Sequence, residues 1–217
     1  MRKLSIIAAI LVLSHGAFAQ VTNFTVQNNS FETLPAGGLN IPCGGVCAYD
    51  YGPIPDWTVT GSVGQQIIAG YNNNPATPYG NYFAFSNGGT ISQTVTTVVA
   101  GGTYDLQVAV LSRTELPNDS VVQLEVGNTV VATASVVDAG LGTWSFENAI
   151  FTASAGEAGQ PLTILLSAPG EQGDFDAVTL TGTNVPEGGA PSLYVLLAGL
   201  CCFGAIFTSR KQLASRA

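Results

Sequence analysis

Residues 121–128 read Val-Val-Gln-Leu-Glu-Val-Gly-Asn, and this stretch indicates the fold of the chain. Gln123 and Glu125 alternate with apolar residues, as expected for a strand with one face in water and the other against a core. Gly127-Asn128 is a pair that favours a tight turn between antiparallel strands. The same alternation recurs in residues 104–108, Tyr-Asp-Leu-Gln-Val. Both stretches therefore predict strands of an antiparallel sheet with one wet face.

Short runs of this kind extend along the chain in both directions, separated by Gly, Asn and Pro, and almost none has helical spacing. Many short strands with frequent turn residues predict an all-β sandwich or barrel. The predicted strands are residues 22–26, 57–60, 65–69, 82–86, 91–95, 104–111, 121–126, 130–136, 144–152, 162–167 and 175–181.

The N-terminus has the three parts of a secretory signal peptide. Residues 1–3 are Met-Arg-Lys, residues 4–13 are apolar, and residues 17–19 are Ala-Phe-Ala. A positive start, an apolar run and a small-residue cleavage site are the features that signal peptidase requires. We therefore expect residues 1–19 to be removed and the protein to be exported through the inner membrane, with Gln20 as its new first residue.

The C-terminus carries a second targeting pattern. A flexible stretch is followed by an apolar run and two cations: Val185, Pro186, Glu187, Gly188, Gly189, then residues 192–209, then Arg210 and Lys211. The run spans roughly 25 Å as a helix, which is adequate for a hydrocarbon core of about 30 Å. It predicts one C-terminal transmembrane helix with a basic tail. A plain membrane anchor is one reading of it, and a cleavable sorting signal is the other.

The tail resembles the PEP-CTERM sorting signals of Gram-negative bacteria, which an exosortase recognises and cleaves. Val185-Pro186-Glu187 matches the start of the motif, whereas Gly188 stands where proline is usual, so the motif belongs to a variant class. The resemblance implies an exosortase-type processing enzyme as a partner, transient anchoring, and release to the cell envelope, cell surface or extracellular matrix. The expected organisation is 1–19 signal peptide, 20–183 β-sandwich ectodomain and 184–217 sorting signal.

Charge and composition narrow the chemistry of the exported segment. All 14 acidic residues lie between Glu32 and Glu187, whereas only Arg113 of the 6 basic residues does, so its net charge is near −13. Such a domain repels nucleic acid, and we expect no nucleic-acid partner. The only histidine, His15, is in the signal peptide, and the segment has no lysine. Histidine-dependent nucleophilic catalysis, histidine-ligated zinc and Schiff-base chemistry are therefore excluded, and calcium is the natural counterion.

Four landmarks along the segment resemble those of galactose-binding-like jelly-roll domains, which include carbohydrate-binding modules. They are residues 28–32 (Asn-Asn-Ser-Phe-Glu), 55–57 (Pro-Asp-Trp), 102–106 (Gly-Thr-Tyr-Asp-Leu) and 174–180 (Asp-Phe-Asp-Ala-Val-Thr-Leu). The resemblance implies an antiparallel jelly-roll β-sandwich. It also implies a structural calcium ion held by Glu32 and Asp176, although Ala177 stands where the family often has a second Asp or Asn. Two solvated surface carboxylates are the alternative.

Three residues are candidates for ligand binding. Tyr71 and Tyr79 lie in Asn-rich stretches that place aromatic faces beside amide groups, a mixture that suits a sugar-binding surface. The same composition is ordinary for β-loops. Arg113, as the single cation, either pairs with Glu115 or Asp119 or contacts a polar ligand.

Cys43 and Cys47 are separated by Gly-Gly-Val, and they would face an oxidising compartment after export. The glycines allow the chain to close tightly, so we predict a disulfide bond between them.

These features predict an exported, non-catalytic protein of the cell surface or biofilm matrix that binds carbohydrate, with extracellular polysaccharide as the expected partner. A purely structural or adhesive surface protein is one alternative. A glycoside hydrolase is another, because 14 acidic residues include many that could form the required carboxylate pair.

Overall fold

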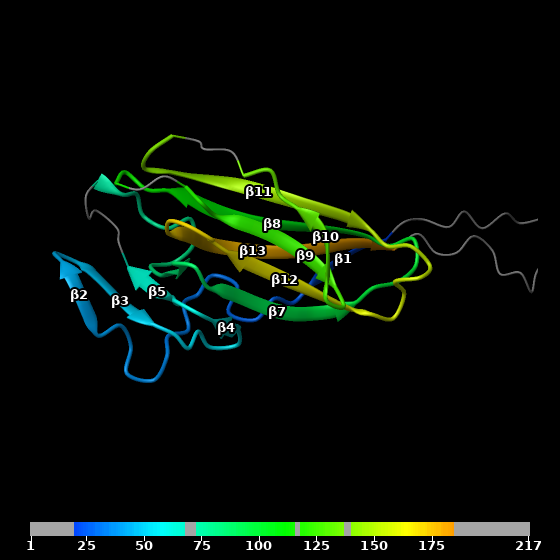
Figure 1. Ribbon diagram of the computed structural model, residues 1–217, viewed down its shortest axis with the longest axis horizontal. Helices are drawn as coiled ribbons and strands as arrows, with labels where there is room; N and C mark the ends of the chain where they lie inside the picture. The colour runs from blue at the N-terminus through cyan, green and yellow to red at the C-terminus, as the bar shows by residue number, and fades with distance from the viewer. Residues whose placement is uncertain (1–19, 68–72, 116–117, 137–139, 185–217) are drawn as a thin grey trace, which may run out of the picture. The chain divides into compact units, whose positions relative to one another are not determined.

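Thirteen β-strands make up the regular structure of the described residues (Figure 1). The computed structural model describes residues 20–67, 73–115, 118–136 and 140–184, all within the unit Gln20–Asn184. Among them no helix is able to span a bilayer. The predicted signal peptide, sorting motif, helix 192–209, Arg210 and Lys211 lie outside the described residues.

The strands form two antiparallel sheets. The larger sheet, here called sheet A, runs in the order β11 (Thr143–Thr152), β8 (Thr103–Ser112), β13 (Gly173–Asn184), β6 (Phe83–Ser86), β5 (Val63–Ile67), β3 (Cys47–Tyr51) and β2 (Ile41–Gly44), with β1 (Gln20–Phe24) also paired to β13. The smaller sheet, sheet B, runs β10 (Thr129–Thr133), β9 (Val121–Val126), β12 (Pro161–Ser167), β7 (Thr90–Thr97) and β4 (Thr58–Thr60). This arrangement confirms the predicted all-β fold of two antiparallel layers; its jelly-roll type stays a prediction.

The main core lies between the two sheets and explains the alternation seen in the sequence. Val122, Leu124 and Val126 of β9 are buried, whereas Gln123 and Glu125 are only half-buried. Sheet A contributes buried side chains from its inner face, among them Val108, Val110, Phe175 and Leu180. Because burial of apolar surface is the dominant favourable term in folding, this shared core holds the two layers together.

Eleven of the thirteen strands overlap the predicted ones, but the hairpin of β2 and β3 is missing from the prediction. Residues 41–51 contain Pro, two Gly and two Cys, so their alternation is hard to recognise. Tyr49 and Tyr51 both lie in β3. The predicted disulfide Cys43–Cys47 is confirmed, and it closes the tip of this hairpin.

A β-bulge interrupts β13 between Asp176 and Thr179. Ala177 there adopts a positive φ of 49°, and its backbone N–H donates to the Oδ1 atom of Asp176 at 2.7 Å. The extra residue lets Phe175 and Val178 both be buried in the main core although they are three residues apart. Before the bulge the strand alternates regularly, so Asp174 and Asp176, on either side of Phe175, both lie on the opposite, outer face of sheet A.

Candidate functional site

The outer face of sheet A carries a row of side chains fixed by strand register. Tyr51 of β3 pairs with Gly64 of β5, Gly64 with Phe85 of β6, Phe85 with Asp174 of β13, and Asp174 with Leu111 of β8. Directly opposed residues in antiparallel strands point to the same face. The register therefore brings an acidic residue from the last strand next to aromatic residues from the first half of the chain.

Gly64 makes the aromatic part of this row possible. A Cβ atom at this position would lie 2.8 Å from two ring atoms of Phe85 and would clash with the carbonyl oxygen of Asp50. Without a side chain at residue 64, the rings of Phe85 and Tyr51 meet, with their centroids 5.5 Å apart. Tyr49 joins them, at 5.6 Å from Tyr51 and 6.2 Å from Phe85.

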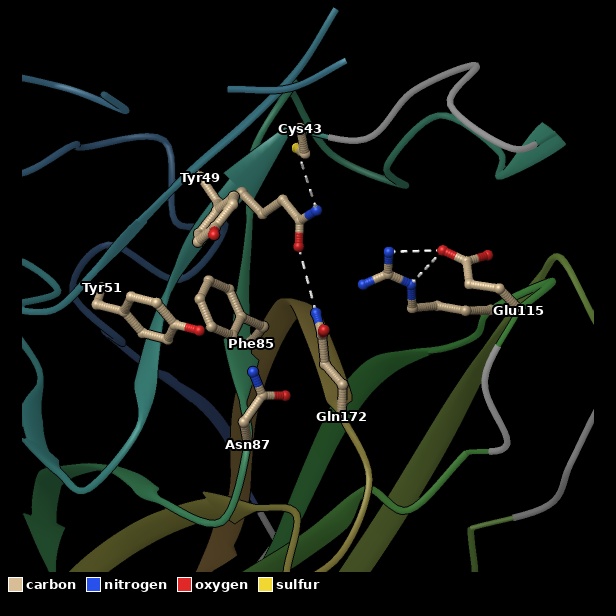
Figure 2. A pocket seen from close by; sticks show the side chains of 9 residues that line it. Cys43, Tyr49, Tyr51, Phe85, Asn87, Glu115 and Gln172 are labelled. Atoms are coloured by element: carbon tan, nitrogen blue, oxygen red, sulfur yellow. Dashed lines mark hydrogen bonds and ion pairs between the residues drawn. The ribbon is translucent and has the colours of Figure 1, made fainter. Parts of the chain in front are cut away.

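These rings form one wall of a cavity of about 330 Å³ on the outer face (Figure 2). Figure 2 shows Tyr49, Tyr51 and Phe85 grouped on one side, Glu115 on the opposite side, and Gln172 between them. The rest of the lining is polar except for the disulfide: Gln66, Asn87, Gln172, Arg113, Glu115 and Cys43. The pocket thus combines aromatic faces with amide, guanidinium and carboxylate groups.

Arg113 occupies the polar side of the pocket and is almost fully buried. Its Nη2 and Nε atoms donate to Oε1 of Glu115 at 2.6 and 3.0 Å, and its Nη1 atom lies 3.8 Å from Oδ2 of Asp174. Burial tends to raise the pKa of Glu115, but hydrogen bonds from Thr114, Asn74 and Arg113 outweigh it and lower this pKa. The pairing of Arg113 with Glu115 is one of the two roles that the sequence allowed for it; the other, contact with a ligand, stays a prediction.

Asp174 is fully buried beside this pair. Its Oδ1 atom accepts a hydrogen bond from Nε2 of Gln172 at 2.7 Å, whereas Oδ2 has no hydrogen-bond partner among the described residues. Burial raises the pKa of Asp174 to about 7, although the charge of Arg113 and the hydrogen bond from Gln172 oppose the shift. The charge of Glu115 raises it further. Ionisable groups with strongly shifted pKa values beside a pocket are typical of functional sites.

The disulfide is linked to Asp174 through two amide side chains. Nε2 of Gln66 lies 3.5 Å from Sγ of Cys47, and Oε1 of Gln66 accepts a hydrogen bond from Nε2 of Gln172 at 3.2 Å. The same Gln172 nitrogen donates to Asp174. Gln66 is therefore held between the hairpin and the buried carboxyl group.

A second carboxyl pair lies under the loop that follows Tyr79. The backbone N–H of Tyr79 donates to Oδ2 of Asp176 at 3.0 Å, and those of Asn81 and Tyr82 both donate to Oε1 of Glu32 at 2.8 Å. Burial raises the pKa of Asp176 to about 7, hydrogen bonds from two backbone N–H groups oppose this, and the charge of Glu32 adds to the rise. The structure thus brings Glu32 and Asp176 together, as the resemblance implied.

The predicted ligand residues have different outcomes. Arg113 lines the pocket, whereas the Tyr79 side chain is exposed on the loop over Asp176, and Tyr71 lies outside the described residues. The sequence analysis missed Phe85 as a pocket residue and Asp174 as the buried carboxyl group beside the pocket. The sequence did contain a signal for this site. Asp174 and Asp176 alternate with the apolar Phe175, which places two acidic residues on one face of a predicted strand.

A protein-family model described as HpiC1 cyclase, HpiC1-like, matches residues 22–181. The chain belongs to the HpiC1-like family. The match covers nearly the whole HpiC1-like unit Gln20–Asn184, including both sheets and every described residue of the pocket. A search of curated proteins gives no significant match.

Several solved structures resemble this HpiC1-like domain at a distance. The C-terminal CBM6 of LamC, a marine laminarinase from Zobellia galactanivorans, is 19% identical with a TM-score of 0.37, over 50% of this chain and 85% of that one. TmCBM61 in complex with β-1,4-galactotriose is 18% identical with a TM-score of 0.43, and the match covers 73% of this chain and 97% of that one. The CBM22-1–GH10 modules of xylanase 10B from Clostridium thermocellum are 17% identical with a TM-score of 0.43, and the match covers 62% of this chain and 27% of that one. Likenesses this distant carry no argument about ligand or activity.

The two raised carboxyl pKa values make a prediction about stability. Asp174 and Asp176 have pKa values of about 7 in the folded state, against 3.8 for an unperturbed aspartate. The folded state therefore binds more protons between pH 4 and 7, so the free energy of unfolding falls as pH rises through this range and levels off above it. The pKa of Glu115 is lowered from its ordinary value of 4.5, so this group stays ionised throughout the range from pH 5.5 to pH 8 that the following experiment covers.

In calcium-free buffer, we expect the free energy of unfolding to fall between pH 5.5 and pH 8, with Asp174 contributing about 2 kcal/mol. Asp174→Asn should remove that contribution, as measured by urea denaturation at each pH. The matched control is Asp56→Asn, an exposed site with a positive φ that asparagine tolerates. A wild-type domain whose stability rises over this range would contradict the assignment.

Proposed function

We propose that the domain binds a carbohydrate in the outer-face pocket of sheet A, and that it does so as a non-catalytic module of an exported protein. The observation that carries the proposal is one wall of aromatic rings facing a rim of amide, guanidinium and carboxylate groups. Sugars present apolar C–H faces and a ring of hydroxyl groups, and these two surfaces match the two sides of the pocket.

The size and chemistry of the pocket support a small ligand. Its volume of about 330 Å³ lies at the lower end of the range, roughly 300–1,000 Å³, that is typical of small-molecule sites. Gln66, Asn87 and Gln172 offer both donors and acceptors, which hydroxyl groups require. Tyr51 is 47% exposed, so its ring is accessible to an incoming ligand.

Export and surface sorting belong to the same proposal and rest on the sequence. Signal peptidase would remove residues 1–19, and an exosortase-type enzyme would cut near Glu187 within the motif Val185-Pro186-Glu187-Gly188-Gly189. Arg210 and Lys211 would hold the tail on the cytoplasmic side of the inner membrane until then. The intact mass of protein extracted from the cell surface tests this, and a dominant species that retains residues 193–217 would overturn the cleavage.

A glycan array probed with residues 20–184 tests carbohydrate binding directly. We expect a restricted set of glycans to bind, and Tyr51→Ala to weaken that binding roughly tenfold or more, since loss of about 1.4 kcal/mol of ring contact has this effect. Tyr79→Ala is the matched control, because Tyr79 is exposed and does not line the pocket.

Two results would contradict the proposal. If Tyr79→Ala abolishes binding and Tyr51→Ala does not, the binding surface is the loop over Asp176. If no glycan binds although the domain is folded, the protein is better described as a structural or adhesive surface protein.

Calcium is proposed as a structural ion at Glu32 and Asp176. The charge of Glu32 contributes to the raised pKa of Asp176, and Arg113 forms its ion pairs with Glu115 and Asp174 instead. An oxygen-binding cation would relieve this repulsion, and carboxylate oxygens suit calcium. Glu32 and Asp176 are only two ligands, and no cluster of three such side chains occurs in the described part of the chain, so backbone carbonyls and water would supply the rest.

If calcium binds there with an affinity of about 10 µM, 1 mM calcium should stabilise the domain by roughly 2.7 kcal/mol. For a domain of this size, the melting temperature should rise by roughly 5 to 10 °C. A chelator should reverse the rise, and Asp176→Ala should prevent it. An equal rise with sodium chloride at matched ionic strength would show general screening and no specific site.

Acid catalysis is the second candidate function. It is favoured by the family description, a cyclase, and by the Oδ2 atom of Asp174 beside the pocket, which accepts no hydrogen bond from the described residues. In such an enzyme Asp174 would be the group that exchanges a proton with the substrate. Mass spectrometry of each bound ligand after prolonged incubation separates the two functions: an unchanged ligand supports the binding module, whereas a product that disappears with Asp174→Asn supports the enzyme.

A further inference from the structure

The three rings of the pocket meet at nearly right angles. The interplanar angle is 90° between Tyr49 and Tyr51, 75° between Tyr51 and Phe85, and 77° between Tyr49 and Phe85. A neutral sugar stacks on one ring face and does not require three mutually perpendicular rings. Perpendicular rings at these separations can instead share one cation about 4 Å from each ring centre, well inside the ~6 Å range of cation–π attraction.

The charge of the pocket also favours a cation. Arg113 is the only basic residue between Gln20 and Asn184, which contain 13 acidic residues. Its guanidinium group is bound by Glu115 and lies 3.8 Å from Asp174, so two carboxyl groups face one positive charge. The domain as a whole carries an excess of negative charge, which concentrates cations and repels anions, and this argues against a uronic acid or a phosphorylated ligand.

The carboxyl group of Asp174 also favours a cation, because the Nη1 atom of Arg113 lies 3.8 Å from its Oδ2 atom, too far for a hydrogen bond. Asp174 is fully buried, its Oδ2 atom has no hydrogen-bond partner in the described residues, and it lies in register with Phe85 on the same face. An unsatisfied buried carboxyl oxygen is costly, and a positive charge bound nearby would reduce that cost.

We propose that the ligand of this pocket carries an organic ammonium group, held against Tyr49, Tyr51 and Phe85. In a carbohydrate, this means an amino sugar whose amine is free and not acetylated. The inference rests on the proposed carbohydrate-binding function and narrows its substrate class. Gln66, Asn87 and Gln172 then bind the hydroxyl groups, while the aromatic corner selects the charged nitrogen.

Three matched tetrasaccharides test the inference by isothermal titration calorimetry: β-1,4-linked glucosamine, its N-acetylated form, and cellotetraose. All three have the same linkage, and they differ in the group on the carbon that bears the amine in glucosamine: a free amine, an acetylated amine or a hydroxyl group. The domain Gln20–Asn184, a unit with its own core, should bind the glucosamine tetramer at least about tenfold more tightly than the other two. This preference should shrink at 0.5 M salt, because salt screens the charge contribution.

Variants assign the effect to the pocket. Tyr51→Phe keeps the ring and should retain the preference, whereas Tyr51→Leu removes it and should lose most of the preference. Glu115→Gln removes the carboxylate that pairs with Arg113 and should weaken binding of the amine form alone. Glu125→Gln makes the same charge change on β9 of sheet B and should have no effect.

The outcomes separate this inference from the function on which it rests. Equal binding of all three tetrasaccharides overturns the ammonium inference and leaves carbohydrate binding intact. If no saccharide binds but choline does, with dependence on Tyr51, the ammonium site stands and carbohydrate binding fails. If neither the glucosamine tetramer nor choline binds to the folded domain, the inference is wrong.

Discussion

The burial of Asp174 next to Arg113 is the interaction on which the rest of the outer face depends. A buried carboxylate is costly in a medium of low polarity unless a cation and hydrogen bonds compensate it. Here compensation is partial: Gln172 donates to one oxygen, Arg113 stands 3.8 Å from the other, and Glu115 already takes the closest contacts of that guanidinium. A face evolved only for stability would place an apolar residue at this point. Buried carboxyl groups with shifted pKa values are concentrated at functional sites, and Asp174 fits that pattern.

The shape of the pocket follows from a few residues that hold its aromatic wall and its polar side in place. Gly64 removes a side chain so that Phe85 and Tyr51 can meet, and the Cys43–Cys47 bridge fixes the hairpin that carries Tyr49. Gln66 connects that hairpin to Gln172 and so to Asp174. The three aromatic rings lie on strands, which favours a rigid, preformed aromatic wall.

Much of the fold could be predicted because burial on one face of a strand leaves an alternating pattern, as in residues 121–126. The hairpin of β2 and β3 could not, because Pro42 and the Cys–Gly–Gly run obscure that pattern. Arg113 could be predicted as a candidate site residue from charge alone, since it is the only basic residue between Gln20 and Asn184. The pocket itself was beyond reach, because Tyr51, Phe85 and Gln172 are far apart in sequence and only the pairing of β3, β5, β6 and β13 brings them together. For the same reason Tyr79, an aromatic residue in an apparently suitable loop, was an equally reasonable candidate.

The most direct test of this account is a measurement of the Asp174 side chain. Its carboxyl carbon can be followed by NMR through a pH titration of the ¹³C-labelled, calcium-free domain, with Asp174→Asn used to assign the signal. The account predicts a midpoint of about 7, because the group is buried and only partly compensated. A midpoint near the ordinary value of 3.8 would show that Asp174 is solvated or fully paired, and would contradict the central claim.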